Sequence, residues 1–340
     1  MKAAVVEGPN QLVVKDIPEP EMGEYGALCE ILYGATCSGT DSHILDGTFP
    51  WISPLPTVPG HESIGRVVAA GGKVRHLKPG DLVTRVGTPP VKGYSVTWGG
   101  FAEMGVATDH QAAREDGLPP ERWRDSQRQL ALPPGVDPAA ATMVITWRET
   151  LSYITRMGVA AGKSILVIGT GGNGLSYTSH AAAAGAEPRV VIGSAGREAT
   201  ARRAGATHFV DYKAPDAAKA AGAVCPQGFN LVIDAVGKVG GGDLGLSLLK
   251  PGGIIGIYGI DDFGKCTLNP DRARGTFTVY RDYLDETETH DEVVRRMQAG
   301  VLDASVWLDL EHPFPLDAIA DAFEAVRSRR VVKALVRMRG

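Results

Sequence analysis

The sequence feature that most restricts the fold is a glycine-rich turn at residues 169–174, which reads Gly-Thr-Gly-Gly-Asn-Gly. Residues 164–168, directly before it, form a short apolar run that is typical of a buried parallel strand. Residues 175–184, directly after it, are rich in alanine and predict a helix that ends at Gly185. A strand, a glycine turn and a helix in this order predict the opening unit of a parallel sheet.

The spacing of the glycines, G-x-G-x-x-G, indicates a dinucleotide site when it stands between a strand and a helix. Gly169 allows the tight turn, Gly171 allows backbone to approach a pyrophosphate, and Gly174 allows the helix to pack closely on the strand. The helix N-terminus offers N–H groups and a partial positive charge to the phosphates. The residues of the turn that we expect to contact the cofactor are Gly169, Gly171, Gly172, Asn173 and Gly174.

Length and charge narrow the class of protein. A chain of 340 residues suggests two domains, and a net charge of −4 gives no reason to expect nucleic acid or an anionic membrane as a partner. No apolar run approaches the roughly 20 residues that span a bilayer, and residues 1–7 lack the apolar core of a signal peptide. We therefore expect a cytoplasmic protein that acts on a small molecule.

Cysteine usage argues against a disulfide framework. The four cysteines are scattered and form no C-x-x-C pair, which also argues against a four-cysteine zinc site. They are Cys29, Cys37, Cys225 and Cys266.

The pattern of predicted secondary structure changes near the middle of the chain. Residues 1–145 read as short strands separated by Gly and Pro turns, which predicts a β-rich, partly open barrel or sandwich. Residues 158–280 alternate strands with helices, which predicts a parallel sheet with helices on both faces. Residues 109–129 are polar and charged, and we predict a surface loop with one helical turn there.

Two stretches of the first half carry candidate chemistry, at residues 37–43 (C-S-G-T-D-S-H) and 59–62 (P-G-H-E). Cys, His and carboxylate side chains suit Zn²⁺, and a catalytic zinc site uses three protein ligands with one position open. Thr40 and His43 could pass a proton between an alcohol and solvent. The alternative is structural: Cys37 as a small core residue and His61 as the cap of a strand.

With these motifs the chain resembles the medium-chain dehydrogenases/reductases, and in particular the zinc-type alcohol and polyol dehydrogenases. The motifs that carry the resemblance are G-T-D-S-H at 39–43, P-G-H-E at 59–62, K-P-G-D at 78–81, G-G-F-A-E at 99–103 and the glycine turn. The resemblance implies an α/β protein with a β-rich, partly open, GroES-like catalytic domain at 1–150 that is completed by about 285–340. It implies a Rossmann domain with a doubly wound parallel sheet at 151–284, and a homodimer or homotetramer.

The resemblance also implies a role for each matching residue. His61 is similar to the metal-binding histidine, and Glu62 to the neighbouring carboxylate that ligates or steers the metal. Asp41 is similar to the carboxylate that orients this histidine. Thr40 and His43 are similar to the proton relay.

The chain departs from the family pattern at the other ligands. In the usual C-x-T-D-x-H pattern the ligand cysteine falls on Ser38, whereas the cysteine here is Cys37, so either residue is a candidate. Glu149 opens a stretch similar to the E-P-L-S of polyol dehydrogenases and is either a further metal ligand or a carboxylate at a helix start. Residues 85–98 contain no cysteine, so the structural zinc of the family is expected to be absent.

The end of the second strand predicts the nicotinamide cofactor. An NAD site usually has Asp or Glu there, about 20 residues beyond the glycine turn, whereas this chain has Gly193. Ser194 and Arg197 could bind a 2′-phosphate by a hydrogen bond and a charge-assisted contact. We therefore predict NADP, with NAD second; the alternative places Arg197 on a solvated helix face.

The sequence thus predicts an NADP-preferring oxidoreductase that interconverts a small alcohol or polyol with its ketone or aldehyde, assisted by one Zn²⁺. One alternative is a zinc-free quinone or enoyl reductase of the same family. A second is a non-catalytic NADP-binding protein. Trp51 and Trp98 are candidate walls of the substrate pocket, although a packing role is equally consistent with the sequence.

Overall fold

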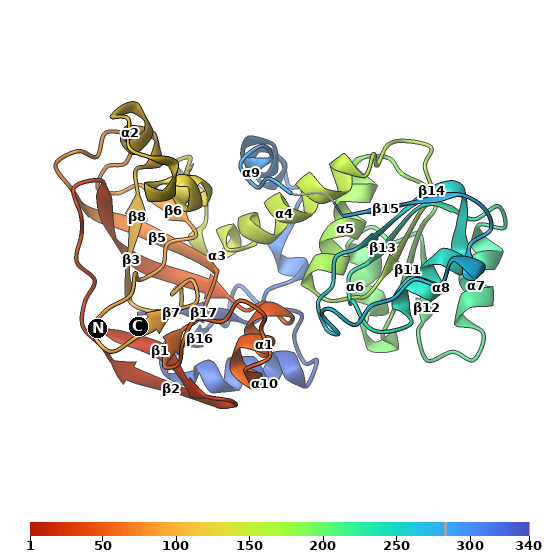
Figure 1. The fold of residues 1–340 in the computed structure, drawn as a ribbon, viewed down its shortest axis with the longest axis horizontal. Coiled ribbons are helices and arrows are strands. Elements are labelled where there is room, and N and C mark those ends of the chain that lie inside the picture. The colour runs from red at the N-terminus through yellow and green to blue at the C-terminus, as the bar shows by residue number, and fades with distance from the viewer. Residues whose placement is uncertain (282–283, 340) are drawn as a thin grey trace. The chain divides into compact units, whose positions relative to one another are not determined.

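The computed structural model describes residues 1–281 and 284–339, which divide into two compact units (Figure 1). Unit 1 comprises Met1–Ile145, His290–Gln298 and Trp307–Gly340, and unit 2 comprises Thr146–Thr289 and Ala299–Val306. The chain passes from unit 1 to unit 2 inside helix α4 (Met143–Arg156).

Unit 2 is built on a six-stranded sheet in which every pair of neighbours is parallel, in the order β12-β11-β10-β13-β14-β15. The strands are β10 (Ile165–Ile168), β11 (Arg189–Gly193), β12 (His208–Asp211), β13 (Phe229–Asp234), β14 (Leu249–Ile257) and β15 (Phe277–Tyr280). The strand order reverses beside β10, which is the doubly wound arrangement of dinucleotide-binding sheets. The predicted fold class is therefore confirmed for this unit.

Helices lie on both sides of this sheet (Figure 1). They are α5 (Gly172–Ala183), α6 (Glu198–Arg203), α7 (Ala217–Val224) and α8 (Gly241–Leu248), with the 3₁₀ turns η3 (Ala195–Arg197), η4 (Pro270–Arg272) and η5 (Ala304–Val306). Helix α7 begins three residues later than the predicted 214–221, because the backbone N–H of Ala214 and that of Ala217 first close turns within 211–217.

The glycine turn has the geometry that its sequence requires. Gly169 has φ +115°, in the region that favours glycine. A Cβ on Gly174 would lie 2.2 Å from the carbonyl oxygen of Gly169, so the helix can begin this close to the strand only without a side chain there. Gly171 is the N-cap of α5. The β-branched and leucine side chains of β10 are all buried, which anchors the turn to the centre of the sheet.

Unit 1 is built from two mostly antiparallel sheets. One has seven strands, in the order β16-β17-β3-β5-β6-β9 with β8 paired to β3, and the other has the order β2-β1-β4-β7. The strands are β1 (Lys2–Gly8), β2 (Gln11–Asp16), β3 (Gly26–Ala35), β4 (Thr57–Val58), β5 (Glu62–Ala70), β6 (Leu82–Thr84), β7 (Ser95–Val96), β8 (Met104–Thr108), β9 (Ala131–Leu132), β16 (Phe314–Pro315) and β17 (Leu335–Arg337). Two such sheets from short strands agree with the β-rich domain that the sequence predicts.

The helices of unit 1 are short. They are α1 (Thr40–Asp46), α2 (His110–Glu115), α3 (Pro138–Ala141), α9 (His290–Gln298) and α10 (Ile319–Arg327), with 3₁₀ turns η1 (Pro120–Arg122), η2 (Arg124–Arg128) and η6 (Leu316–Ala318). The prediction of a loop with one helical turn at 109–129 was wrong, because Asp109 caps a complete short helix and two 3₁₀ turns follow. A carboxylate at an N-cap is a strong local helix signal.

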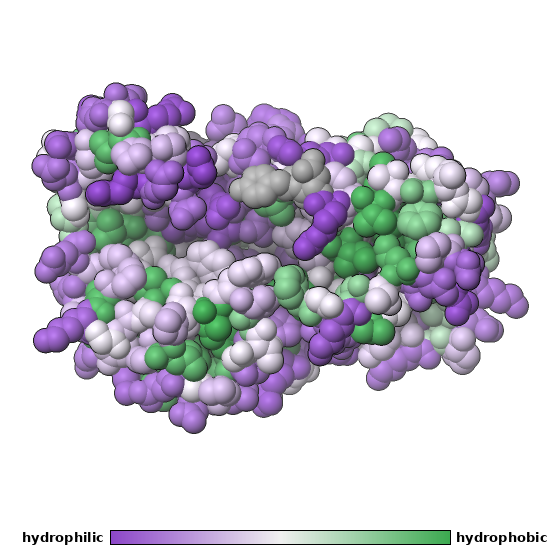
Figure 2. Space-filling model, viewed as in Figure 1, coloured by the Kyte–Doolittle hydropathy of each residue, from purple (hydrophilic) through white to green (hydrophobic). Residues whose placement is uncertain are grey.

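The surface is mostly hydrophilic on the face shown in Figure 2, with hydrophobic side chains gathered on part of unit 2. Val279, on the edge strand β15, is one of the exposed large hydrophobic residues. In the part of the chain that the structure describes, none of the helices has the length and apolar character needed to cross a bilayer.

Candidate functional site

Strand register in unit 1 brings three distant parts of the chain to one place. Strands β3 and β5 pair so that Ala35 faces Glu62, and β17 pairs with β3 so that Leu335 also faces Ala35. Cys37 follows the end of β3, and Lys333 precedes the start of β17. The ends of β3, β5 and β17 therefore place the side chains of Cys37, Glu62 and Lys333 at a common edge.

Ligand atoms of Cys37, His61 and Glu62 lie within 4.8 Å of one another at this edge. The side chains of His61 and Glu62 are buried, and that of Cys37 is half-buried. Ser38, the alternative to Cys37, is exposed. A thiol, an imidazole and a carboxylate that converge in a partly buried position fit Zn²⁺, so the residues present suit the metal that the sequence predicts.

Asp41 connects two of these side chains. Its Oδ2 accepts a hydrogen bond of 2.7 Å from the backbone N–H of Cys37, and its Oδ1 lies 3.4 Å from Nδ1 of His61. The Asp41 side chain is 1% exposed. An Asp41 carboxylate that attracts the Nδ1 proton leaves Nε2 as the nitrogen that can bind a metal.

The electrostatic field of the site favours positive charge. Burial lowers the pKa of His61, but the interactions with Asp41 and Cys37 outweigh it, and the pKa lies well above the usual value. A proton on His61 and a bound metal ion would therefore satisfy the same negative surroundings.

Lys333 is a second cation at the same place. Its Nζ contacts Oε2 of Glu62 and donates a hydrogen bond of 3.1 Å to the carbonyl oxygen of Thr36, and both charged side chains are 2% exposed. Burial lowers the pKa of Lys333, but the charges of Glu62 and Cys37 more than offset it and raise the pKa. Lys333 is not among the residues predicted from the sequence, although a lysine inside the apolar run 332–336 is a signal that could have identified it.

The predicted relay residues Thr40 and His43 both lie in α1. Nδ1 of His43 is 2.7 Å from the hydroxyl of Thr48, which lies 2.5 Å from Oδ1 of Asp46. The hydrogen bonds described for His43 thus lead to Thr48 and Asp46 and not to Thr40. No motif distinguishes Thr48 in the sequence, and its contact arises because the chain turns back after α1.

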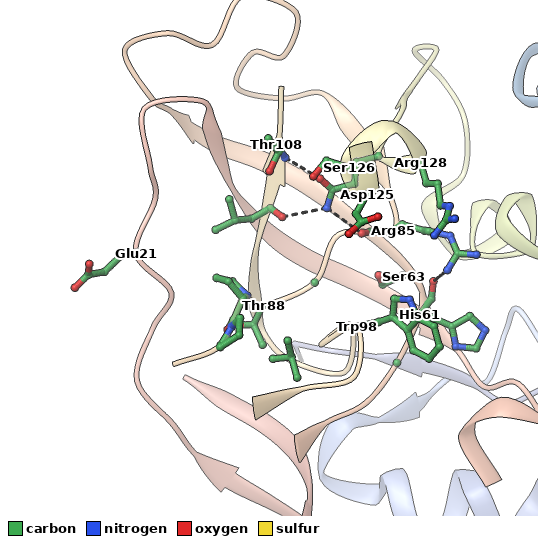
Figure 3. Close-up of a pocket in the computed structure, with 17 residues that line it drawn as sticks. Glu21, His61, Ser63, Arg85, Thr88, Trp98, Thr108, Asp125, Ser126 and Arg128 are labelled. Carbon is green, nitrogen blue, oxygen red and sulfur yellow. Dashed lines mark hydrogen bonds between the residues drawn. The ribbon is translucent and has the colours of Figure 1, made fainter. Parts of the chain in front are cut away.

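A cavity of about 720 Å³ opens beside His61 (Figure 3). It is lined from one side by Gly60, His61 and Trp98, and from another by the segment that contains η2. The residues of this segment that line it are Asp125, Ser126, Arg128 and Gln129. The end of the 109–129 segment, for which the sequence predicts no function, therefore contributes a polar wall to the cavity next to the candidate metal ligands.

Two residues of the cavity wall have an uncommon backbone. Trp98 has φ +71° and Arg85 has φ +54°, a conformation that side chains rarely adopt. The Trp98 ring lies 5.0 Å from the His61 ring and 5.6 Å from the Phe49 ring, between centroids. Trp51 packs against Phe49 and is not among the residues that line this cavity.

Gln129 holds the strained residue Arg85 in place. Its side-chain nitrogen donates 3.2 Å hydrogen bonds to the carbonyls of Arg85 and Val106, and its oxygen accepts one of 2.7 Å from Thr108. Nη1 of Arg85 donates to the carbonyl oxygen of His61 at 3.3 Å. Figure 3 shows the Arg85 and Arg128 side chains directed toward the end of the cavity where His61 lies.

Glu149 lies in unit 2, where the hydroxyl of Tyr258 donates a 3.2 Å hydrogen bond to its carboxylate. The interpretation of Glu149 as a carboxylate at a helix start was wrong, because α4 begins six residues earlier, at Met143. Its role as a metal ligand stays a prediction. Within the described residues, the carboxylate that joins Cys37 and His61 is that of Glu62.

The predicted cofactor residues lie at the carboxyl ends of β10 and β11 in unit 2. Gly172, Asn173 and Gly174 form the first turn of α5, Ser194 is the N-cap of η3, and Arg197 is the last residue of η3. The backbone N–H of Ser194 lies 3.4 Å from the hydroxyl of Thr170, which joins the two loops. The carboxyl ends of parallel strands are the edge at which such sheets bind ligands.

Sequence profiles of two known families match the chain. Residues 25–117 match the alcohol dehydrogenase GroES-like domain, and residues 204–332 match a family described as zinc-binding dehydrogenase. The two profiles thus fall on the two parts of the chain that carry the candidate site and the parallel sheet.

Individual proteins are similar over nearly the whole chain. L-galactonate-5-dehydrogenase of Escherichia coli is 25% identical over 99% of this chain and 98% of its own, and D-arabinitol dehydrogenase 1 of Uromyces fabae is 24% identical over 99% and 97%. A solved structure of a zinc-binding dehydrogenase from Sinorhizobium meliloti 1021, with NADP bound, superposes with a TM-score of 0.80 at 24% identity, over 99% of each chain. This last likeness is one of fold.

Proposed function

Because the chain belongs to the zinc-type alcohol dehydrogenases of the medium-chain dehydrogenase/reductase family, we propose that it interconverts an alcohol or polyol with its ketone or aldehyde. Hydride would pass between the substrate and NADP, with NAD as the second choice. The metal would be one Zn²⁺ held at the Cys37–His61–Glu62 site, with no structural zinc.

The observation that carries this proposal is the convergence of three different ligand types beside a cavity. Atoms of Cys37, His61 and Glu62 lie within 4.8 Å of one another, and His61 also lines the cavity. A Zn²⁺ ion bound there would act as a Lewis acid that polarises a substrate oxygen and lowers the pKa of an alcohol. The cavity then supplies the place in which the remainder of the alcohol is held.

The protein's own residues have distinct tasks in this proposal. Asp41 fixes Cys37 through its backbone N–H and orients His61 through Nδ1. His43, with its Nδ1 bonded to the hydroxyl of Thr48, offers a route along which an alcohol proton leaves the site. Thr40, at the first position of α1, is the proposed entry to this route.

The character of the cavity supports a substrate with more than one hydroxyl group. Arg85, Asp125 and Arg128 line it and offer both donors and acceptors, while Trp98 adds an apolar face. The two curated relatives named above carry the names of polyhydroxylated substrates. A polyol or a sugar acid would therefore use more of this cavity than a short alcohol.

NADP is favoured by the residues that follow β11. Ser194 and Arg197 lie at the turn where the ribose of a dinucleotide is expected, and Gly193 supplies no carboxylate to repel a 2′-phosphate. The NADP bound in the Sinorhizobium meliloti structure supports the same choice. The glycine turn at 169–174 would receive the pyrophosphate.

A panel assay tests the proposal. Primary and secondary alcohols, pentitols, hexitols, sugar acids, a quinone and an enone are offered with each nucleotide, before and after chelation and again after Zn²⁺ is restored. We expect turnover of a polyol or alcohol with NADP, loss on chelation and recovery with Zn²⁺, and loss of stoichiometric zinc in His61→Ala. Turnover of the quinone or enone by metal-free protein would instead identify a zinc-free reductase. Nucleotide binding without any turnover would identify a non-catalytic protein.

A further inference from the structure

Lys333 places a fixed positive charge where a metal ion is expected to bind. Its Nζ contacts Oε2 of Glu62 and donates to the carbonyl of Thr36, and its side chain is 2% exposed. Leu335, two residues further on, pairs with Ala35 at the end of β3, so the position of this ammonium is set by the strand pairing.

Stability alone gives no reason for a charged pair at this point. Desolvation of two ions costs several kcal/mol, and hydrophobic residues of similar volume often serve a core equally well. Arg148 beside Glu286 is a second buried cation near a carboxylate among the described residues, and neither side chain belongs to the Cys37–His61–Glu62 cluster. The Lys333–Glu62 pair differs from it because its carboxylate is also a candidate ligand.

Glu62 divides its two oxygens between two neighbours. Oε2 contacts Lys333, whereas Oε1 lies 3.7 Å from Nε2 of His61, on the side of the ligand cluster. The same carboxylate is therefore within reach of the ammonium and of the metal position. A bond from Glu62 to a metal ion would weaken its interaction with Lys333, because both cations draw on one negative charge.

We propose, on the basis of the zinc site in the proposed function, that Lys333 is a positioning residue that competes with the metal ion for Glu62. Lys333 thereby makes Glu62 an exchangeable ligand, which leaves a coordination position open for substrate. In the metal-free protein the same ammonium replaces the metal as the countercharge of Glu62 and keeps the ligand residues together.

A double-mutant cycle on metal binding tests this inference. The variants are Lys333→Met, Glu62→Gln and their combination, with Lys333→Arg to keep the charge. Zn²⁺ affinity is measured by competition with a chromophoric chelator. The absorption spectrum of the Co²⁺-loaded protein reports whether Glu62 has joined the ligands. Lys2→Met, which removes an exposed lysine paired with Asp317, is the matched control.

We expect Lys333→Met to tighten Zn²⁺ binding about 10-fold, at the lower end of the range that partners of metal ligands control. Its Co²⁺ spectrum should differ from that of the wild type. In the Glu62→Gln background, Lys333→Met should tighten Zn²⁺ binding at least ~3-fold less than in the wild type, because part of the effect of Lys333 acts through Glu62. In that background Lys333→Met should also leave the Co²⁺ spectrum unaltered. Lys333→Arg and Lys2→Met should keep the wild-type affinity.

Equal tightening in both backgrounds, or an unchanged Co²⁺ spectrum, would overturn the inference while leaving the zinc site in place. A wild-type protein that binds no Zn²⁺ would instead refute the zinc site itself, so the two failures are distinguishable. If Lys333→Met does not fold without metal, Lys333→Gln is used in its place. Its amide can still donate to Glu62 and Thr36 but carries no charge.

Discussion

Replacing Asp41 by Asn changes the group that orients His61 while it keeps the shape of the site. The Asp41 carboxylate accepts from the backbone N–H of Cys37 at 2.7 Å and faces Nδ1 of His61 at 3.4 Å. Asn is nearly the same size but has one acceptor oxygen and one NH₂ donor. When the oxygen serves Cys37, the NH₂ faces His61, whose Nδ1 must then accept. The imidazole proton moves to Nε2, and the nitrogen that would bind the metal loses its lone pair.

The expected loss of Zn²⁺ affinity in Asp41→Asn follows from the role of groups that orient a metal-binding histidine. Loss of the group that orients a ligating histidine costs about 10–100-fold in metal affinity, which corresponds to about 1.4–2.7 kcal/mol of binding free energy. The stability of the folded protein decreases by less than the free energy of metal binding. A neutral hydrogen bond to Cys37 replaces a charged one, a change of about 1 kcal/mol in the free energy of unfolding. Metal affinity should therefore fall while the metal-free protein stays folded.

The assay is a Zn²⁺ competition titration together with thermal unfolding of the metal-free protein. Asp81→Asn is the control, because the Asp81 side chain accepts a turn hydrogen bond of 3.0 Å from the backbone N–H of Lys78 on the surface. Wild-type Zn²⁺ affinity in Asp41→Asn would refute the argument that Asp41 sets the tautomer of His61. An equal loss in Asp81→Asn would show that the effect is not specific to the site.

Three further outcomes are expected. Arg197→Ala should raise the KM for NADP about 10-fold or more, because charge-assisted hydrogen bonds contribute about 1.5–3 kcal/mol. The KM for NAD should stay nearly unchanged. Both constants are measured by steady-state kinetics, with Arg202→Ala as the matched control. Gly193→Asp should lower the thermal unfolding midpoint unless Thr170→Gly accompanies it, because a Cβ at 193 would lie 2.2 Å from Cγ2 of Thr170. Asp109→Ala should lower the urea unfolding free energy by about 3 kcal/mol, because the buried carboxylate accepts three backbone N–H hydrogen bonds. Burial raises the pKa of Asp109, but those hydrogen bonds outweigh it and lower the pKa below 3.8. The contribution of Asp109 to the free energy of unfolding is therefore complete above pH 3.8. The difference in stability between Asp109→Ala and the wild type should shrink as the pH falls through the folded-state pKa.

The parts of the molecule that could be predicted from the sequence are those determined by nearby residues. A β-branched run, a glycine turn and an alanine-rich stretch specify one βα unit, and the structure has β10, the turn and α5 at 165–183. The closeness of Cys37 and His61 has a related cause. Each lies next to the end of a strand, and a single antiparallel pairing of β3 with β5 brings those ends together.

The parts that could not be predicted depend on long-range pairing. Lys333 is 271 residues from Glu62 in the chain, and only the pairing of β17 with β3 makes them neighbours. The role of residues 125–129 as a cavity wall depends in the same way on Gln129, whose side chain forms hydrogen bonds with backbone groups of Thr108, Val106 and Arg85. A polar segment with no periodicity gives no sign of such contacts before the sheet is assembled.

The structure changes what the glycine at position 193 indicates about the cofactor. In the sequence, the missing carboxylate at 193 indicates a preference for a 2′-phosphate. The structure gives a second reason for the glycine, because Thr170 fills the space that any Cβ at 193 would enter and its hydroxyl lies 3.4 Å from the backbone N–H of Ser194. Glycine at 193 is thus required by the packing of the two loops, whichever nucleotide binds. The proposed preference for NADP would therefore depend on Ser194 and Arg197, which makes Arg197→Ala the decisive substitution for cofactor selectivity and Gly193→Asp alone a test of packing.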